Sequence, residues 1–517
     1  MNRAARVPSL IGLAPLLLFF ATRPAAAAID YRVSLADPAA HTFHVTMTIP
    51  VEGRDVITAL PAWNALYRIR DFAQRVGPIR AVCPAVTAVP LNKRLMDKQT
   101  WHFWIESACQ PGDHNSFQID YLIEWNAPGP FNSQLDAHHA FINLAEILMY
   151  VPDRRIEDVS IEFVDLPNGW KIAAELPAGK SDHSFTASGY DRLVDAPVEA
   201  GTFEEFDFNE SGAPFRAVVD SRSWNRSVLE DALHRITRSE MQMMGGPPFD
   251  PPSREYTFFF HIGPEGDVEG GGMEHRNCDA ISALSTEAAI AIAAHEFFHV
   301  WNVKRIRPQS LEPVDYTKEQ YTRALWFAEG VTSTYAAYTL ERTGLWTKAQ
   351  FLADLAEQIT ELQSRPARLW QSVEESSLDA WFEKYDFYNT PDHSISYYNK
   401  GQLLGVLLDL AIRDATDNRK SLDDVLRRLN TQYALQGKFY DDSAGVRGAV
   451  EEVSGKDFAD FFARYISGVE ELPYDKFLSL AGLETKTVSG RVTVAEIAQS
   501  TDRQRRILNG ILHGSTD

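Results

Sequence analysis

Hydrophobic and polar residues alternate along the first part of the chain. The segments 43–49 and 117–125 each place apolar side chains at every second position, with polar residues between most of them. A period of two is typical of a strand that buries one face. Clusters of Gly, Pro, Asp and Asn separate these runs. We therefore expect residues 29–215 to form an N-terminal, sandwich-like β domain.

A different pattern begins at about residue 216. Helical periodicity over 223–244 is followed by a short apolar strand, 255–262, and a glycine-rich turn. Long apolar helices follow, so the overall fold class is expected to be multidomain α+β. The predicted parts after the β domain are an α+β domain (216–345), a helical domain (346–475) and a C-terminal tail (476–517). The tail has weak periodicity and a polar end, and it is expected to be loosely docked.

The first 28 residues have the pattern of a secretory signal. Arg3 and Arg6 precede the apolar stretch 10–21, and three alanines, 26–28, provide a small-residue cleavage site. The apolar stretch is too short to span a bilayer comfortably. The segment is bacterial in style, so we expect export, most simply to the periplasm, and no membrane anchor after cleavage.

Composition limits the partners of the chain. Its 517 residues carry a net charge of −21, which disfavours nucleic acid and anionic membranes as partners. The three cysteines are too few for a cysteine-stapled scaffold. Cys83 and Cys109 are either a disulfide or two free thiols, and Cys278 is left over. The sequence does not define an oligomeric state.

The strongest candidate chemistry lies in one apolar segment, 285–304, which is predicted to be a helix capped by Ser285 or Thr286. His295 and His299 are four residues apart, so on a helix they share one face and can hold one metal ion, usually zinc. Glu296, next to the first histidine, is placed to act as general base toward water. The alternative is a pair of buried histidines satisfied by backbone partners.

A catalytic zinc ion normally takes three protein ligands. Glu329 is the only acid in the apolar helical segment 325–335, so we expect it to complete a site for one zinc ion per chain. The alternative is that Glu329 is an acid at a helix N-terminus, where the helix dipole stabilises its negative charge. His261, His275 and Cys278 are alternative ligands, but none has the helical spacing of the first pair.

Two further features bear on substrate binding. Tyr398 precedes an apolar helix over 402–413, where a phenol can stabilise an oxyanion or simply pack. Gly271 and Gly272 lie before Glu274, and glycines allow a peptide to approach the backbone closely. Glu274 itself either binds a positive substrate group or stabilises a strand end.

The combined motifs resemble those of gluzincin aminopeptidases. They occur in the same order: Gly271–His275, His295–His299, Trp326–Gly330 and Tyr398–Gly401. The longer strings His295–Pro308 and Leu325–Tyr335 resemble the glycyl aminopeptidase family, as do Leu60–Trp63 and Arg70–Ala73. The resemblance covers roughly residues 30–483. Family members often carry a PDZ domain, and the residues after Gly482 are too few for one, so either this lineage has lost it or the chain is truncated.

The resemblance implies a role for each matching residue. His295, His299 and Glu329 match the zinc ligands, and Glu296 matches the general base. Tyr398 matches the tyrosine that stabilises the oxyanion, and Glu274 matches the acid that binds the α-ammonium group of the substrate. The implied catalytic domain is thermolysin-like.

The implied function is removal of small N-terminal residues from peptides, glycine first, then alanine or serine. Two alternatives remain on the same fold. A zinc endopeptidase would use the same His295, Glu296, His299 and Glu329 without an amine clamp. A catalytically dead peptide-binding protein would need no general base.

Overall fold

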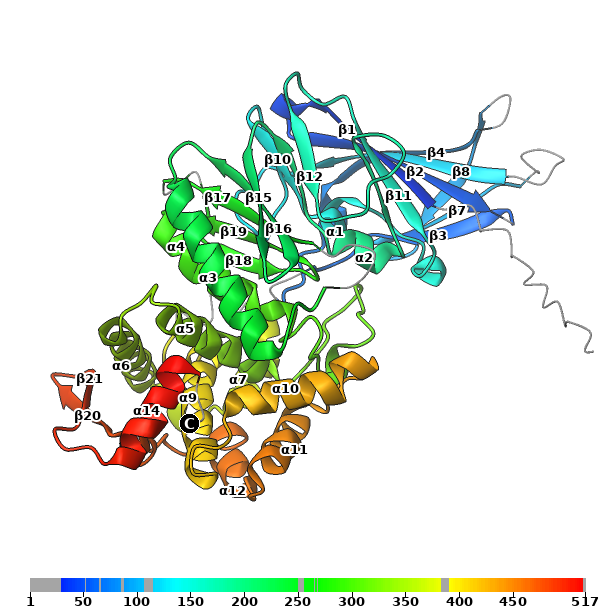
Figure 1. Cartoon of the computed structure of the whole chain (residues 1–517). Helices are drawn as coiled ribbons and strands as arrows, with labels where there is room; N and C mark the ends of the chain where they lie inside the picture. The colour runs from blue at the N-terminus through cyan, green and yellow to red at the C-terminus, as the bar shows by residue number, and fades with distance from the viewer. Residues whose placement is uncertain are drawn as a thin grey trace, which may run out of the picture.

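The computed structural model describes residues 29–514, apart from 52, 65–66, 85–87, 107–114, 250–254, 265, 267 and 383–389. Figure 1 shows a β-rich N-terminal part at one end and a group of helices at the other, with a further sheet and its helices between them. This arrangement confirms the expected multidomain α+β class. The proposed signal sequence and Cys109 lie outside the described residues.

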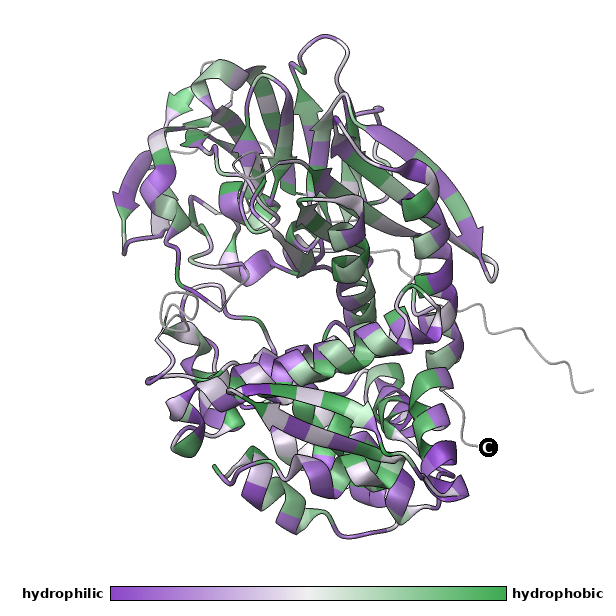
Figure 2. Cartoon of the chain, turned by 90° about the vertical axis from the view of Figure 1, so that its left-hand side faces the viewer, coloured by the Kyte–Doolittle hydropathy of each residue, from purple (hydrophilic) through white to green (hydrophobic). Residues whose placement is uncertain are grey.

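A seven-stranded sheet is the largest element of the N-terminal part. Its spatial order is β13 (Ser184–Ala187), β11 (Val159–Val164), β1 (Ile29–Asp37), β2 (Thr42–Val51), β8 (Asn115–Glu124), β4 (Val76–Cys83) and β5 (Val89–Pro90). The predicted alternation sets its central register. Val45 pairs with Tyr121 and Met47 with Ile119, and all four side chains are buried on one face. Figure 2 shows the alternation as successive hydrophobic and hydrophilic bands along the strands.

Two smaller sheets complete this part. The first contains β3 (Asp55–Ala59), β7 (Thr100–Trp104) and β6 (Asn92–Leu95). The second contains, in spatial order, β12 (Lys171–Ala174), β14 (Val198–Gly201), β10 (His139–Ile142) and β9 (Gln134–Leu135). Short helices α1 (Leu144–Ile147) and α2 (Tyr190–Val194) connect these strands. The N-terminal part is therefore β-rich, as the alternation predicted.

The central sheet carries the residues of the candidate chemistry. Its spatial order is β15 (Glu204–Glu210), β16 (Ala213–Ser221), β17 (Tyr256–Ile262), β19 (Cys278–Ala283) and β18 (Gly271–Glu274). β16, β17 and β19 are parallel, and β18 is an antiparallel edge strand. The sheet already begins at Glu204, on the N-terminal side of the predicted boundary at 215/216. Helices α3 (Arg226–Met244) and α4 (Thr286–Glu296) follow β16 and β19.

The remaining chain is mainly helical, as expected. Its principal helices are α5 (Thr332–Arg342), α6 (Lys348–Ser364), α7 (Val373–Leu378), α9 (Tyr397–Ala415), α10 (Leu422–Gln432), α11 (Asp442–Ser454), α12 (Ala459–Phe461) and α13 (Tyr474–Leu478). α9 is the most buried of the long ones, with both faces covered. Its Arg413 is fully buried and pairs with Asp409 at 3.0 Å.

The expectation of a loosely docked tail is wrong. A hairpin of β20 (Leu483–Val488) and β21 (Arg491–Glu496) leads to the amphipathic helix α14 (Asp502–His513). α14 buries Ile507, Leu508, Ile511 and Leu512. The buried Arg413 donates to the Gly510 carbonyl at 3.0 Å, and Arg342 donates to that of Ile511 at 2.9 Å. The apolar residues of this mostly polar C-terminal segment thus occur at helical spacing and form one stripe along α14.

Two of the three cysteines lie among the described residues. Cys83 is disulfide-bonded, whereas Cys278 is a free, buried thiol. No helix in the described part of the chain is long and apolar enough to cross a membrane.

Candidate active site

Helix α4 positions the two candidate zinc-binding histidines. Ser285 caps it, accepting a hydrogen bond from the Ala288 amide at 3.2 Å, as predicted. The α-helix ends at Glu296, and a 3-10 turn, Phe298–Val300, continues it. The Nε2 atoms of His295 and His299 lie 3.0 Å apart, so the two imidazoles share one face as expected.

Glu329 completes the group. Its Oε2 lies 3.5 Å from His295 Nε2 and 3.2 Å from His299 Nε2. His299 Nδ1 donates to the Asn302 carbonyl at 2.6 Å, which orients the ring so that Nε2, the nitrogen nearest Glu329, can bind a metal ion. The structure thus brings the three predicted ligands together.

A π-helical turn, η6 (Trp326–Val331), carries Glu329 and leads into α5. π-Turns in α-helices frequently occur at functional sites. Asn302 links this turn to the histidine segment, because its Nδ2 donates to the Phe327 carbonyl at 2.9 Å and to Thr332 Oγ1 at 3.1 Å. The two ligand-bearing segments are therefore held together by a buried amide.

Tyr398 stands at the start of α9. Ser396 caps this helix, accepting from the amides of Tyr398 at 3.1 Å and Asn399 at 3.3 Å. The half-buried Tyr398 ring lies 6.1 Å from the His295 ring, measured between centroids. α9 also touches η6 directly, because a Cβ on Gly330 would overlap the backbone of Gly401. The two glycines let the tyrosine helix pack against the Glu329 turn.

Glu274, at the end of the edge strand β18, lies close to Glu296 of α4. One carboxylate oxygen from each, together with a His299 nitrogen, lie within 4.8 Å of one another. Gly272 borders Glu296 so closely that a Cβ there would overlap its carboxylate. Gly271 instead contacts the ring of Phe131. Every predicted site residue therefore lies in one region, with Gly272 beside Glu296 and Gly271 packed against the β domain.

Electrostatics show how the ligands interact. Burial alone raises the pKa of Glu329, but His299 and His295 hold it well below its usual value. Burial alone lowers the pKa of His299, but Glu329 and other nearby acids raise it to about 10. Burial raises the pKa of Glu296 well above its ordinary value, opposed by His299 and reinforced by Glu274. His295, His299 and Glu329 are a donor set of two imidazoles and one carboxylate, and a divalent cation there offsets part of the charge of the surrounding acids, so these residues fit zinc.

The site opens into a cleft of about 2210 Å³. Its walls come from distant parts of the chain, including Tyr31 of the β domain, Glu274 of the central sheet and Tyr398 of α9. Typical small-molecule pockets are about 300–1,000 Å³. The cleft has room for an extended chain such as a peptide.

Two family models match the chain. The model of the Peptidase M61 N-terminal domain matches residues 30–202. The model of M61 glycyl aminopeptidase matches residues 288–404, a stretch that contains both histidines, Glu329 and Tyr398. The chain belongs to the M61 glycyl aminopeptidase family.

Solved structures support the same assignment for this M61 enzyme. An aminopeptidase N family protein from Idiomarina loihiensis is 25% identical, with a TM-score of 0.81, and the match covers 89% of this chain and 79% of that one. An M1 zinc metallopeptidase from Deinococcus radiodurans is 14% identical, with a TM-score of 0.50, covering 86% of this chain and 94% of that one. No curated protein sequence matches significantly. By family the M61 chain is an aminopeptidase, and it shares its fold with the M1 zinc metallopeptidase.

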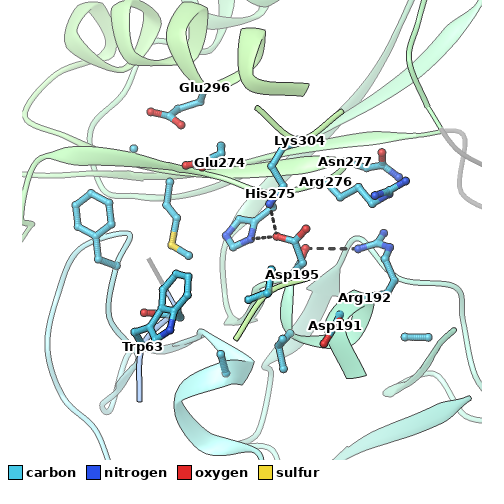
Figure 3. Close-up of a pocket in the computed structure, with 18 of the residues that line it drawn as sticks. Trp63, Asp191, Arg192, Asp195, Glu274, His275, Arg276, Asn277, Glu296 and Lys304 are labelled. Carbon is cyan, nitrogen blue, oxygen red and sulfur yellow. Dashed lines mark hydrogen bonds and ion pairs between the residues drawn. The ribbon is translucent and has the colours of Figure 1, made fainter. Parts of the chain in front are cut away.

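Sequence reasoning missed one charged cluster in the cleft of the M61 enzyme. Asp195 accepts from Lys304 Nζ at 2.9 Å and from His275 Nδ1 at 3.1 Å. Figure 3 shows this cluster in the same pocket as Glu274 and Glu296. These contacts hold the pKa of Asp195 well below its usual value despite its burial. Lys304 lies in the His295–Pro308 string, but nothing in the sequence near Asp195 indicated its part.

Asn302 was also missed, although it lies in the same string. Its role depends on contacts to residues 327 and 332, which are distant in sequence.

Gly272→Ala is expected to lower kcat by about 10–100-fold with unchanged zinc content, because the new Cβ displaces the Glu296 carboxylate and displacements of about 1 Å can cost 10²-fold. The measurement is steady-state hydrolysis of a Gly-first peptide together with metal analysis. Gly270→Ala is the matched control, since its Cβ would meet nothing closer than the Ser282 carbonyl at 3.9 Å. Equal activity of the two variants would contradict the tight contact with Glu296.

Proposed function

We propose that the protein is a secreted zinc aminopeptidase that removes small N-terminal residues from peptides, glycine first and then alanine or serine. The observation that carries this proposal is the position of Glu274. Its carboxylate lies beside Glu296 and His299, at the edge strand that borders the cleft. A carboxylate there can bind the free amine of a substrate and so restrict cleavage to the first peptide bond.

His295, His299 and Glu329 would hold the zinc ion. Zinc supplies Lewis-acid chemistry, lowering the pKa of water and polarising a carbonyl. Glu296 accepts a proton from the attacking water and delivers it to the leaving amine. The Tyr398 hydroxyl donates a hydrogen bond to the oxyanion that forms at the scissile carbonyl.

Substrate class rests on the family and on the cleft. Matching family models describe glycyl aminopeptidases, which supports a preference for small first residues. One solved structure of the Deinococcus radiodurans enzyme, in mutant form, is bound to a Tyr-Ser-Ala substrate, which supports short peptides as ligands of this fold.

Secretion rests on the first 28 residues, whose basic, apolar and small-residue regions follow the order of a signal peptide. N-terminal sequencing of the protein recovered from a bacterial periplasm tests this part. A mature N-terminus at Ile29 is expected, and an uncleaved cytoplasmic protein would contradict it.

The test of activity compares a Gly-first peptide with its N-acetylated twin, each with and without a zinc chelator. We expect cleavage of the free-amine peptide only, and its loss on chelation, because acetylation removes the charge that Glu274 binds. Cleavage of both peptides would indicate an endopeptidase. Cleavage of neither by zinc-loaded protein would indicate a peptide-binding protein.

A further inference from the structure

A second cluster of metal-ligating side chains lies outside the catalytic cleft. His139 Nδ1 contacts Glu199 Oε1 at 3.0 Å, and His261 Nε2 contacts Glu199 Oε2 at 2.9 Å. His139 Nδ1 also lies 3.4 Å from Asp220 Oδ2. The side chains of His139, Glu199 and His261 are nearly fully buried, whereas that of Asp220 is 40% exposed.

The geometry resembles that of the catalytic ligands. In both clusters two imidazoles and a buried glutamate converge. At the catalytic site the three facing atoms lie 3.0–3.5 Å apart, and here each histidine contacts a different oxygen of Glu199, at 3.0 Å and 2.9 Å. Ligands that share a tetrahedral zinc ion at about 2.1 Å lie about 3.4 Å apart. The ligand atoms of His139, Glu199 and His261 all lie within 4.8 Å of one another.

Several other buried acids are paired with an arginine. Glu175 pairs with Arg192, Glu146 with Arg70, and Asp409 with Arg413. Among the described residues, no lysine or arginine pairs with Glu199 or Asp220.

Two neighbouring residues, Phe141 and Ser282, border the cluster. The Phe141 ring packs edge-on against His261, with centroids 4.8 Å apart. Asp220, His261 and Ser282 are in register across three parallel strands, so they share one face of the central sheet. The Ser282 hydroxyl is fully buried and forms no hydrogen bond with any described residue, which leaves it available to a ligand or water on that face.

We propose that His139, Glu199, His261 and Asp220 form a second divalent-metal site, selective for zinc-like ions. Two imidazole nitrogens and two carboxylate oxygens are a donor set suited to zinc. His139 and Glu199 belong to the sheet of β10 and β14, whereas Asp220 and His261 belong to the central sheet. The ion therefore joins the N-terminal and central parts, and its role is structural. The protein therefore binds two metal ions per chain, whereas the sequence led us to expect one.

The test is a count of bound metal. Full-length mature protein is stripped with a chelator, loaded with Zn²⁺ or Co²⁺, dialysed and analysed for metal per chain. Two equivalents are expected for wild type and one for His261→Ala. His295→Ala, which removes a catalytic ligand, should also retain one. A result of one equivalent for wild type and none for His295→Ala would overturn the second site and leave the catalytic site intact.

Two further variants keep the test decisive if His261→Ala fails to fold. Asp220→Asn changes a partly exposed ligand and should weaken Co²⁺ binding at this site at least about 10-fold. The affinity is measured from the d–d absorption of bound Co²⁺ in a double variant that also carries His295→Ala. His234→Ala is the matched control, because His234 also contacts a glutamate, Glu210, at 3.1 Å, but that glutamate binds Arg238. It should retain two equivalents. Unchanged Co²⁺ affinity in Asp220→Asn would remove Asp220 from the site.

Discussion

Replacing Glu296 with glutamine is expected to lower kcat for a Gly-first peptide by about 10²–10⁴-fold, the usual contribution of a general base. The amide cannot accept a proton from water, but it fills the same space beside Gly272. The catalytic zinc should remain, because His295, His299 and Glu329 are unchanged. Steady-state kinetics and metal analysis measure the two effects separately.

The control for this variant is Glu287→Gln, which changes an exposed acid on the same helix and should leave kcat unchanged. Retention of most activity in Glu296→Gln would remove Glu296 from the base role. Loss of zinc would instead favour the other donor set at this site, in which Glu274, Glu296 and His299 lie within 4.8 Å.

Replacing Glu274 with glutamine is expected to lower kcat/KM for free-amine peptides by about 10²-fold. The reason is the loss of a charged partner for the substrate ammonium in a closed cleft, where removing one member of a buried pair typically costs 2–5 kcal/mol. Discrimination against the N-acetylated peptide should shrink at the same time. The kcat/KM for the free-amine peptide and its ratio to that for the N-acetylated peptide are both measured with the two peptides in competition.

Glu269→Gln is the matched control, since Glu269 lines the same cleft but is exposed. It should keep the wild-type preference for free amines. Undiminished preference in Glu274→Gln would show that another group binds the amine.

The sequence was most informative where local spacing determines geometry. The four-residue spacing of His295 and His299 placed their Nε2 atoms 3.0 Å apart, and the cap at Ser285 formed as expected. Alternation over 43–49 predicted the strand that pairs with β8. Glu329 was placed correctly because a lone acid in an apolar helix needs a cation nearby.

Features that depend on long-range contacts were not predictable in the same way. The second His–Glu cluster unites residues from 139 to 261 on four strands, and only sheet order and register bring them together. Docking of α14 depends on two buried arginines, 342 and 413, that reach its carbonyls. Neither pairing leaves a local pattern. The helical spacing of the apolar residues in α14 was present, but its many charged residues obscured it.

The contact between Gly330 and Gly401 fixes how the site can move. Since backbone meets backbone there, no side chain can rotate to open a gap between the turn that carries Glu329 and the helix that carries Tyr398. The Tyr398 hydroxyl, which we propose binds the oxyanion, is consequently preorganised, and placing it requires little rearrangement during turnover. Any opening of the cleft for peptide entry must come from the opposite wall, where the edge strand and the β domain meet the substrate. Larger residues at either glycine would transmit their disturbance to the metal and to the phenol together.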